Sequence, residues 1–308
     1  MTDTVVIIVA YNTRALTLHA VAAARKAVAG FDARVVVADN GSDGTAESVR
    51  AAHPEVSVLE NPDNPGYGAA VNRAAAAHPA VHVCAMNADV VLEPQCLVIL
   101  RHFLDANPAC GLVGPALAYP DGTSQASAKR FPTIGVALGE VLGVHRAAPR
   151  NRWVRRFYYG GGDIARDTAV DTVSGAVMLL RSDAFDAVGR FDEGFRMYFE
   201  ETDLCRRLRD RRYTVALCPA ARATHQHGAS TRQTSVRQVD YYLSYVRYFR
   251  KHHRRGAAAI LRAAVAAAAV ARMGALLARY PPVTRRRAAS LREKEAACAR
   301  LLRALATS

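Results

Sequence analysis

The chain has 308 residues, of which 51% are hydrophobic and 22% charged, so it holds enough apolar material for one large or two smaller folded domains. Its six cysteines include no C-x-x-C pair, which argues against a zinc ribbon, a redox dithiol or a secreted disulfide scaffold. That cysteine usage indicates a reducing compartment. Because Met1 leads directly into a strand-like run, we expect no secretory signal and a cytoplasmic location.

The net charge of +14 is concentrated near the C-terminus. Residues 1–244 contain 26 Lys+Arg and 25 Asp+Glu, whereas residues 245–308 contain 15 and 2. A tail this basic is expected to bind phosphate groups, either on an anionic membrane surface or on nucleic acid. The alternative is a solvated helical face in a chain rich in Arg and Ala.

The first half of the chain alternates between strand and helix patterns. Apolar runs rich in β-branched residues predict buried strands at 5–9, 34–39, 56–59 and 81–86. Helical patterns lie between these strands, at 14–29, 45–52 and 69–77. Strands separated by helices of this length predict βαβ units, and therefore an α/β fold with a doubly wound parallel sheet.

The second half is less regular. Segment 112–165 is rich in Gly and Pro and is expected to be irregular, followed by a strand at 171–180, a helix beginning near Glu200 and a strand at 213–217. From Asp240 the pattern is helical, with a break at 280–282. We therefore expect a sheet domain over 1–239 and a basic, amphipathic helical extension over 240–308.

The helical extension requires a test for membrane spanning. Only nine uncharged residues lie between Arg262 and Arg272, fewer than the ~20 that a spanning helix needs, so we expect no crossing. One helical face carries four larger apolar side chains, namely Met273, Leu276, Leu277 and Tyr280. This stripe fits either a helix lying in the membrane interface or packing against the rest of the chain.

Polar residues follow three of the predicted strands, where open parallel sheets bind ligands. The first strand ends in Ala10-Tyr11-Asn12, and the second ends at Asp39. Asp39 comes too early to cap the helix from Thr45, so we interpret it as a ligand-binding residue. A carboxylate accepts from the imide N–H of a uracil or thymine ring, and Tyr11 offers a stacking face.

A second carboxylate follows the fourth strand, in Asn87-Ala88-Asp89. Asp89 lies between apolar segments, where a free charge is costly. A divalent cation that bridges to substrate phosphates would neutralise it. The sequence therefore predicts a metal site at this strand end.

The glycine pair around Gly66 fails as a dinucleotide-binding fingerprint, because position six is Val71 and the pair does not follow the first strand. An oxidoreductase is accordingly disfavoured. A glycine loop at a helix start, with Asn72 and Arg73 one turn further on, still suits a site near phosphate or sugar.

Acidic residues begin the helix near position 200, at Glu200, Glu201 and Asp203. Three acids in a first turn are common on solvated helices, but here Tyr198 and other aromatic residues precede them. Carboxylates beside apolar surface have raised pKa values and can act as general bases. Downstream, His225 is a candidate metal ligand, with a structural histidine as the alternative.

Several motifs then occur in one order. They are Ala10-Tyr-Asn12, Asp39-Asn-Gly-Ser42, Asn64-Pro-Gly-Tyr-Gly-Ala-Ala-Val-Asn72, Asn87-Ala-Asp89, Asp121-Gly-Thr-Ser-Gln125, Lys129-Arg-Phe-Pro-Thr133, Ser174-Gly-Ala176, Tyr198-Phe-Glu-Glu-Thr-Asp-Leu-Cys-Arg206 and His225-x-x-Gly228-x-Ser230. The series resembles the inverting family 2 glycosyltransferases of the GT-A fold, in their bacterial rhamnosyltransferase-like branch. The resemblance covers about residues 4–235.

The resemblance implies a role for each matching residue. It assigns the nucleotide-sugar donor to Ala10, Tyr11, Asn12, Asp39, Gly66, Asn72, Arg73, Asn87 and Ala88. It assigns Mg²⁺ or Mn²⁺ to Asp89 and His225, and the acceptor to Ser174, Gly175, Ala176 and Tyr198. The catalytic base would be Glu201, where the family has Asp, with Glu200 as its rival.

The resemblance also implies a reaction. We expect inverting transfer of L-rhamnose from dTDP-L-rhamnose to a lipid-linked or cell-envelope glycan, by an enzyme peripheral on the inner face of the cell membrane. Galactofuranose, glucose and N-acetylglucosamine donors remain alternatives. A nucleic-acid-binding protein or a silent scaffold is a further alternative, and the near-neutral body opposes the first of these.

Overall fold

The computed structural model describes residues 2–148, 151–160, 164–226, 234–278 and 285–307. They belong to two compact units. The sheet unit comprises 1–131, 155–196 and 200–230, and the helical unit comprises 132–154, 197–199 and 231–308.

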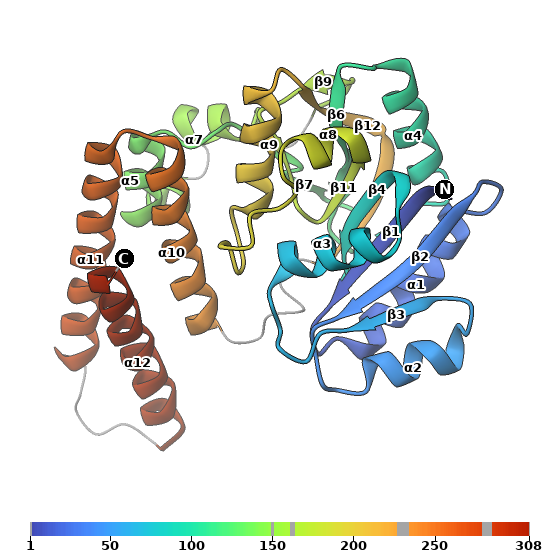
Figure 1. Cartoon of the computed structure of the whole chain (residues 1–308). Coiled ribbons are helices and arrows are strands. Elements are labelled where there is room, and N and C mark those ends of the chain that lie inside the picture. The colour runs from blue at the N-terminus through green and yellow to red at the C-terminus, as the bar shows by residue number, and fades with distance from the viewer. Residues whose placement is uncertain (1, 149–150, 161–163, 227–233, 279–284, 308) are drawn as a thin grey trace. The chain divides into compact units, whose positions relative to one another are not determined.

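A central mixed sheet organises the sheet unit, with the strand order β3-β2-β1-β4-β11-β6-β12-β5 (Figure 1). These strands are β1 (Thr2–Ala10), β2 (Ala33–Asp39), β3 (Ser57–Glu60), β4 (Ala80–Asn87), β5 (Val90–Leu92), β6 (Cys110–Ala118), β11 (Val177–Arg181) and β12 (Thr214–His225). Short strands β7 (Ser124–Gln125) and β9 (Thr168–Ala169) extend it, and β8 (Ala128–Lys129) pairs separately with β10 (Thr172–Val173). The half from β3 to β4 is wholly parallel.

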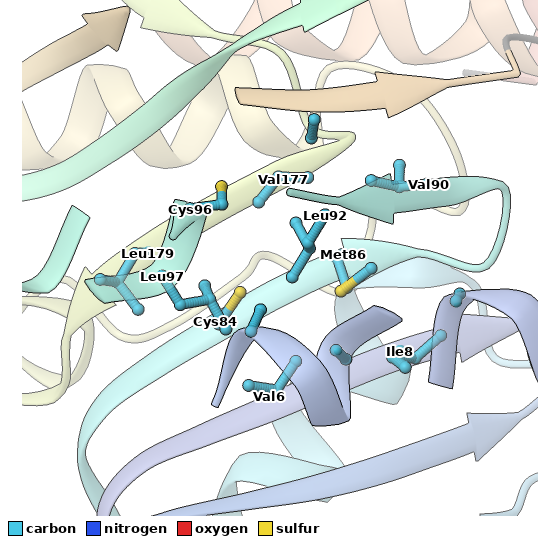
Figure 2. Packing of buried hydrophobic residues seen from close by; sticks show 14 of the residues in the cluster. Val6, Ile8, Cys84, Met86, Val90, Leu92, Cys96, Leu97, Val177 and Leu179 are labelled. Atoms are coloured by element: carbon cyan, nitrogen blue, oxygen red, sulfur yellow. The ribbon is translucent and has the colours of Figure 1, made fainter. Parts of the chain in front are cut away.

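Both faces of this sheet are covered, because apolar side chains alternate along its strands. In β1, Val6 and Ile8 point into one core, together with α1 (Arg14–Ala27), α2 (Thr45–Ala52) and α4 (Cys96–Ala106) (Figure 2). Val5 and Ile7 point into the other, with α3 (Tyr67–Ala77), α8 (Ser182–Ala187) and α9 (Glu200–Asp210). The α/β doubly wound prediction is therefore confirmed.

The predicted strands and helices of the first 87 residues are confirmed to within three residues at each end. Segment 112–165 departs from its prediction, because residues 110–118 form β6, a central strand between β11 and β12. Its Gly111 and Gly114 are close-approach positions, since an added Cβ would lie 3.1 Å from Tyr213 and 3.0 Å from Val173. The predicted strand 171–180 is interrupted by the turn at 174–176, which separates β10 from β11.

The helical unit has a core of its own. It contains α5 (Ile134–Val141), α6 (Val144–Ala147), α10 (Thr234–His252), α11 (Arg255–Ala278) and α12 (Arg285–Thr307), while α7 (Arg152–Phe157) starts in it. The helices of the extension pack on one another, and α11 also packs on α5. Their buried side chains include Tyr245, Phe249, Leu261, Val265 and Leu301. Part of the extension's apolar surface is thus covered by its own helices.

One helix among the described residues, α11, is long and apolar enough to cross a membrane by length and composition. The stretch is Arg255–Leu276, with a mean hydropathy of 1.6 and 17% of its most apolar 18-residue window buried. Our expectation that this region is too short is wrong, because the helix continues past Arg262. The predicted stripe is half-buried at Met273 and Leu276, and the side chains of Leu277 and Tyr280 lie outside the described part.

Candidate active site

The carboxyl end of β1 brings two predicted site segments to one edge of the sheet. The Asn40 N–H donates to the Ala10 carbonyl at 2.8 Å, and the Ala88 N–H donates to the Val9 carbonyl at 3.2 Å. Asp39 and Asp89 therefore lie on either side of this strand end. Neighbouring strands are about 4.8 Å apart, so the two carboxylates can face one extended ligand.

Asp39 is buried and holds the loop that follows it. Its Oδ1 accepts from the Gly41 N–H at 2.9 Å, and its Oδ2 accepts from the Ala46 N–H at 3.0 Å. Ala46 is in the first turn of α2, so the expectation that Asp39 is too distant to cap that helix is wrong. The loop folds back and brings the helix start to the carboxylate. Burial raises the pKa of Asp39, and these two backbone bonds oppose the rise.

The neighbouring loop after β1 is held against the same segment. The Asn12 Oδ1 accepts from the Ser42 N–H at 2.9 Å, with Asn12 itself in the left-handed region at φ 51°. An added Cβ on Gly41 would lie 2.6 Å from the Asn12 nitrogen, so the crossing of the two loops requires glycine. Beside it Tyr11 is 42% exposed, an accessible aromatic face at the strand end.

Asp89 and His225 form a buried pair on the other side of β1. The His225 Nε2 lies 3.3 Å from the Asp89 Oδ1, and both residues are about 5% exposed or less. The His225 Nδ1 lies 2.8 Å from the Gln125 Oε1, so the amide of Gln125 orients the imidazole through this nitrogen. The other ring nitrogen is therefore the one presented to the carboxylate.

This pair fits a divalent cation. The Asp89 Oδ1 is buried and has no hydrogen bond from any described residue. A ligating histidine is typically oriented by a hydrogen bond at its other ring nitrogen, and Gln125 occupies that position here. No group of three or more His, Cys, Asp or Glu placed for a metal occurs in the described ranges. Two protein ligands suffice for an ion that also binds substrate phosphates. Gly228 and Ser230 of the same motif lie outside the described residues.

The start of α9 supplies two buried carboxylates with opposite electrostatics. The Glu201 Oε1 accepts from the Lys129 Nζ at 2.9 Å and from the Thr202 hydroxyl at 2.9 Å. Burial alone would raise the pKa of Glu201, but the charge and hydrogen bond of Lys129 bring it below its usual value. Glu201 is therefore ionised at neutral pH.

Glu200 has no ion pair within the described part of the chain, and the charge of Lys129 lowers its pKa only weakly. Burial, reinforced by the charge of Glu201, raises the pKa of Glu200 to about 8, and its Oε2 has no hydrogen-bond partner among the described residues. It is therefore mostly protonated at pH 7. Both carboxylates follow a strained turn, since Tyr198 and Phe199 have φ values of 69° and 66°.

Segment 174–176 links α9 to the strand ends. An added Cβ on Gly175 would lie 3.4 Å from the Cβ of Glu201, so the segment lies against that side chain. The Gly175 carbonyl accepts from the Tyr67 hydroxyl at 3.1 Å, and the Ala176 carbonyl accepts from the Asn87 N–H at 3.0 Å. Glu201 is thereby connected through one short segment to the strand that ends before Asp89.

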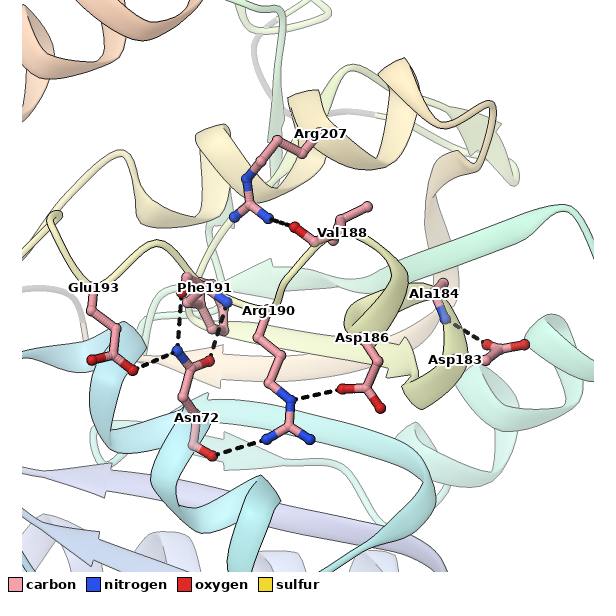
Figure 3. Close-up of polar contacts among 9 residues, drawn as sticks. All are labelled: Asn72, Asp183, Ala184, Asp186, Val188, Arg190, Phe191, Glu193 and Arg207. Carbon is pink, nitrogen blue, oxygen red and sulfur yellow. Dashed lines mark hydrogen bonds and ion pairs between the residues drawn. The ribbon is translucent and has the colours of Figure 1, made fainter.

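Two residues predicted to bind the donor are used elsewhere. Asn72 holds the loop after α8, donating to the Phe191 carbonyl and to Glu193 at 3.0 Å each, while its Oδ1 accepts from the Phe191 N–H (Figure 3). Arg73 forms a two-bond ion pair with Asp63. Gly66 has φ 97°, and an added Cβ there would overlap the Arg196 carbonyl oxygen, so this glycine allows a close backbone approach.

Two further residues that we singled out from the sequence make packing or ion-pair contacts within the protein. Tyr198 belongs to the helical unit, where its ring meets Tyr241 edge-on at 5.6 Å. Asp203 of the acidic turn is fully buried and ion-paired to Arg207 at 2.8 Å. The arginine also donates to the Val188 carbonyl, which ties α9 to the end of α8 (Figure 3).

Sequence reasoning missed three residues that organise the site, namely Lys129, Gln125 and Tyr67. All three lie in quoted motifs, but no role was predicted for them. Lysine is rare here, with 4 among the 41 basic residues, so the lysine of the Lys129-Arg-Phe-Pro-Thr133 motif was the available signal. Nothing in the sequence pairs Gln125 with a histidine 100 positions away, because that contact depends on how β7 folds back on β6.

Comparison with known proteins identifies the family of the chain. Residues 5–189 match the family described as Glycosyl transferase family 2. The chain is 34% identical over 210 residues to the N-acetylglucosaminyl-diphospho-decaprenol L-rhamnosyltransferase of Mycobacterium tuberculosis, covering 64% of this chain and 67% of that protein. It is also 42% identical over 62 residues to rhamnosyltransferase WbbL of Escherichia coli, covering 20% of this chain and 24% of that protein.

A solved structure has the same fold. The mannosyltransferase PcManGT from Pyrobaculum calidifontis, in complex with GDP-Man and Mn²⁺, matches with a TM-score of 0.58 at 18% identity, covering 100% of this chain and 88% of that one. The family match, the rhamnosyltransferase relatives and this fold agree. The chain is thus a glycosyltransferase that belongs to family 2, in its rhamnosyltransferase-like branch.

Proposed function

We propose that this enzyme transfers L-rhamnose from dTDP-L-rhamnose, with inversion, to a hydroxyl group of a polyprenyl-diphosphate-linked N-acetylglucosamine. The observation that carries the chemical part is the buried, ionised Glu201, held by Lys129 beside the 174–176 segment. The sugar and the acceptor are inferred from the relatives named as rhamnosyltransferases, one of which acts on a decaprenol-linked N-acetylglucosamine.

Glu201 is suited to take up the proton of the acceptor hydroxyl. A general base must be unprotonated before the reaction, and Glu201 meets this condition at neutral pH whereas Glu200 does not. A hydroxyl beside Gly175 that loses its proton to Glu201 would attack the anomeric carbon from the face opposite the departing diphosphate. Such an attack inverts the configuration at that carbon.

The strand ends of β1 and β2 are suited to the nucleotide. Each oxygen of Asp39 already accepts one backbone N–H, and each retains a further lone pair. An imide N–H of thymine can use it, with the ring stacked on Tyr11. The roles proposed earlier for Asn72 and Arg73 lose support, because both side chains are engaged in holding loops.

Asp89 and His225 would hold Mg²⁺ or Mn²⁺ on the donor diphosphate. The bound ion would supply positive charge where negative charge develops on the leaving phosphate. In support, the buried Asp89 Oδ1 has no hydrogen bond from the described residues, and the structural neighbour with GDP-Man holds Mn²⁺.

A lipid-linked acceptor would bring the enzyme to the inner face of the cell membrane. We propose that it binds there peripherally through the basic helical extension, by attraction to anionic lipids rather than by binding nucleic acid.

A donor panel tests the proposal. Purified full-length protein with Mg²⁺ or Mn²⁺ is incubated with dTDP-rhamnose and with activated galactofuranose, glucose and N-acetylglucosamine, using a short-chain polyprenyl-diphosphate-linked N-acetylglucosamine as acceptor. We expect a rhamnosylated product with inverted anomeric configuration by mass spectrometry and NMR. Preference for another of these donors would refute the rhamnosyl assignment, and a retained configuration would refute the mechanism.

The metal site is tested by Asp89→Ala. We expect the variant to bind Mn²⁺ at least about tenfold more weakly in the presence of dTDP, because one of two protein ligands is lost. Isothermal calorimetry measures this without turnover, and Asp63→Ala removes a surface carboxylate as the control. Unchanged Mn²⁺ affinity in Asp89→Ala would remove this residue from the site.

A further inference from the structure

The two structural units differ in net charge more than the C-terminal tail differs from the rest of the chain. The sheet unit contains 21 Lys+Arg and 23 Asp+Glu, a net charge of −2, whereas the helical unit contains 20 and 4, a net charge of +16. Part of this excess comes from segment 132–154 and not from the C-terminal extension. Segment 132–154 contains three arginines and one acidic residue, Glu140.

The same unit exposes large apolar side chains. Nine such residues are exposed in the described chain, and five belong to the helical unit: Leu142, Val144, Trp153, Ile260 and Val270. Leu142 is 78% exposed and Trp153 is 61% exposed, more than any of the four in the sheet unit. The guanidinium of Arg152 lies over the Trp153 ring at 4.9 Å, so this aromatic side chain carries a cation beside it.

Helix α11 adds an apolar face of its own. Leu261, Val265 and Ala269 are buried, while the opposite face is exposed and contains no charged or polar side chain. That face consists of Ile260, Ala263, Ala267, Val270 and Gly274. A solvated helix face normally carries charges, so an uncharged stripe of this length indicates a partner that is not water.

We propose that the helical unit docks on the headgroup region of an anionic lipid bilayer, with Leu142 and Trp153 inserted and Arg152 bound to lipid phosphates. Tryptophan and arginine suit that region because one is amphipathic and the other keeps its charge at the phosphates. A second copy of the chain is disfavoured, since it would bring +16 against +16. Nucleic acid would satisfy the charge but would leave the leucine and the apolar face of α11 in water.

This inference extends the proposed function, because a lipid-linked acceptor requires an enzyme at a bilayer. It assigns the insertion of apolar side chains to segment 132–154, whereas the proposed function uses the basic extension for electrostatic binding only. Membrane docking and the proposed transfer reaction can be tested separately, because docking is measured without donor or acceptor.

Trp153 is the single tryptophan of the chain, so its fluorescence reports on this segment alone. Full-length protein is titrated with vesicles of phosphatidylglycerol and phosphatidylcholine, and with vesicles of phosphatidylcholine only. We expect a blue-shifted emission and quenching by brominated acyl chains with the anionic vesicles, and neither effect with the neutral ones. Anionic vesicles that bind the protein without changing Trp153 emission would overturn the proposal, as would failure to bind them.

Leu142→Asp tests the insertion directly. We expect vesicle affinity to fall about tenfold, because a buried leucine contributes about one decade of partitioning and the added carboxylate is repelled by the lipids. Tyr119→Ser, at an exposed residue of the sheet unit, is the control and should bind as wild type. Equal affinity of both variants would contradict insertion of this segment.

Two further experiments test the alternative binding partners, a second copy of the chain and nucleic acid. A concentration-dependent shift of Trp153 emission without lipid, together with dimers in sedimentation, would identify a second copy and overturn the proposal. The same shift on addition of duplex DNA would identify nucleic acid. Transfer to a short-chain, water-soluble acceptor should be unchanged in Leu142→Asp, so loss of docking and failure of the proposed reaction remain distinguishable.

Discussion

Glu200 and Glu201 are adjacent in the chain, share a buried helix start and differ in their protonation. The difference comes from one ion pair, between Lys129 and Glu201. Two carboxylates this close cannot both ionise at low cost, so the one that receives the cation keeps the charge and raises the pKa of its neighbour. The pair therefore presents one base and one neutral acid.

The first prediction separates these roles. Glu201→Gln should lower the transfer rate by about 10²–10⁴-fold, because the proton acceptor is lost, while donor binding is largely retained. Glu200→Gln is the matched control, since the amide resembles the protonated acid, and it should keep most of the activity. Initial rates and dTDP binding measure both variants. A Glu201→Gln rate above a tenth of wild type would refute the assignment.

Lys129 is predicted to act through the pKa of Glu201. In Lys129→Met that pKa should rise, so the acidic limb of the rate–pH profile should move to higher pH. Activity should fall most on the acidic side of the profile and recover as the pH rises. Lys129→Arg should leave the limb in place. If the methionine variant is slower by the same factor at every pH, Lys129 has a structural role only.

Among the elements, the glycine before α3 shows how a close approach shapes the site. Gly66 and Gly30 share a φ of 97°, but only Gly66 has a neighbour, the Arg196 carbonyl, where a side chain would stand. The Gly66 carbonyl also accepts from the Asn40 Nδ2 at 3.2 Å, just after Asp39. A shift of this loop would therefore reach the strand end that carries the predicted nucleotide site.

The two glycines make a matched pair for measurement. Gly30→Ala should cost about 1–2 kcal/mol, the penalty of the left-handed backbone alone. Gly66→Ala should cost about 1–3 kcal/mol more, because the added methyl group also overlaps backbone. Urea unfolding followed by circular dichroism gives both values. Equal decreases in the free energy of unfolding would show that the loop can shift at no cost and that the close approach at Gly66 is unimportant for stability.

At the scale of the whole molecule, the accessibility of the six cysteine thiols measures how tightly the sheet unit is packed. All are free thiols, five are buried, and Cys298 of the helical unit is partly exposed. Burial raises the pKa of Cys84 and Cys205 to about 12 and that of Cys218 to about 11. These thiols belong to packed cores and have no part in the proposed chemistry.

A thiol titration tests this packing. In native buffer at pH 8 an aromatic disulfide reagent should modify Cys298 rapidly and the other five slowly, because a buried thiol is neither ionised nor accessible. All six should react in denaturant. Rapid native reaction of two or more thiols would contradict the packing of the sheet unit, and peptide mapping would identify the cysteine involved.

Local patterns were sufficient for the first half of the fold. Strands 5–9, 34–39 and 81–86 were predictable because a doubly covered sheet demands continuous apolar runs, and Asp39 and Asp89 followed as residues at the ends of such strands. The same local reasoning failed at β6, where Gly and Pro indicate irregular structure, because strand pairing and close packing against Val173 and Tyr213 decide its conformation.

The contacts that give the site its chemistry join residues far apart in the chain, so only the folded structure decides them. Lys129 meets Glu201 across 72 positions, and Gln125 meets His225 across 100. These contacts, and the helix start that reaches back to Asp39, depend on distances in space that no local pattern encodes. The residue types at the strand ends could therefore be predicted from sequence, whereas their charges, partners and protonation depend on tertiary packing.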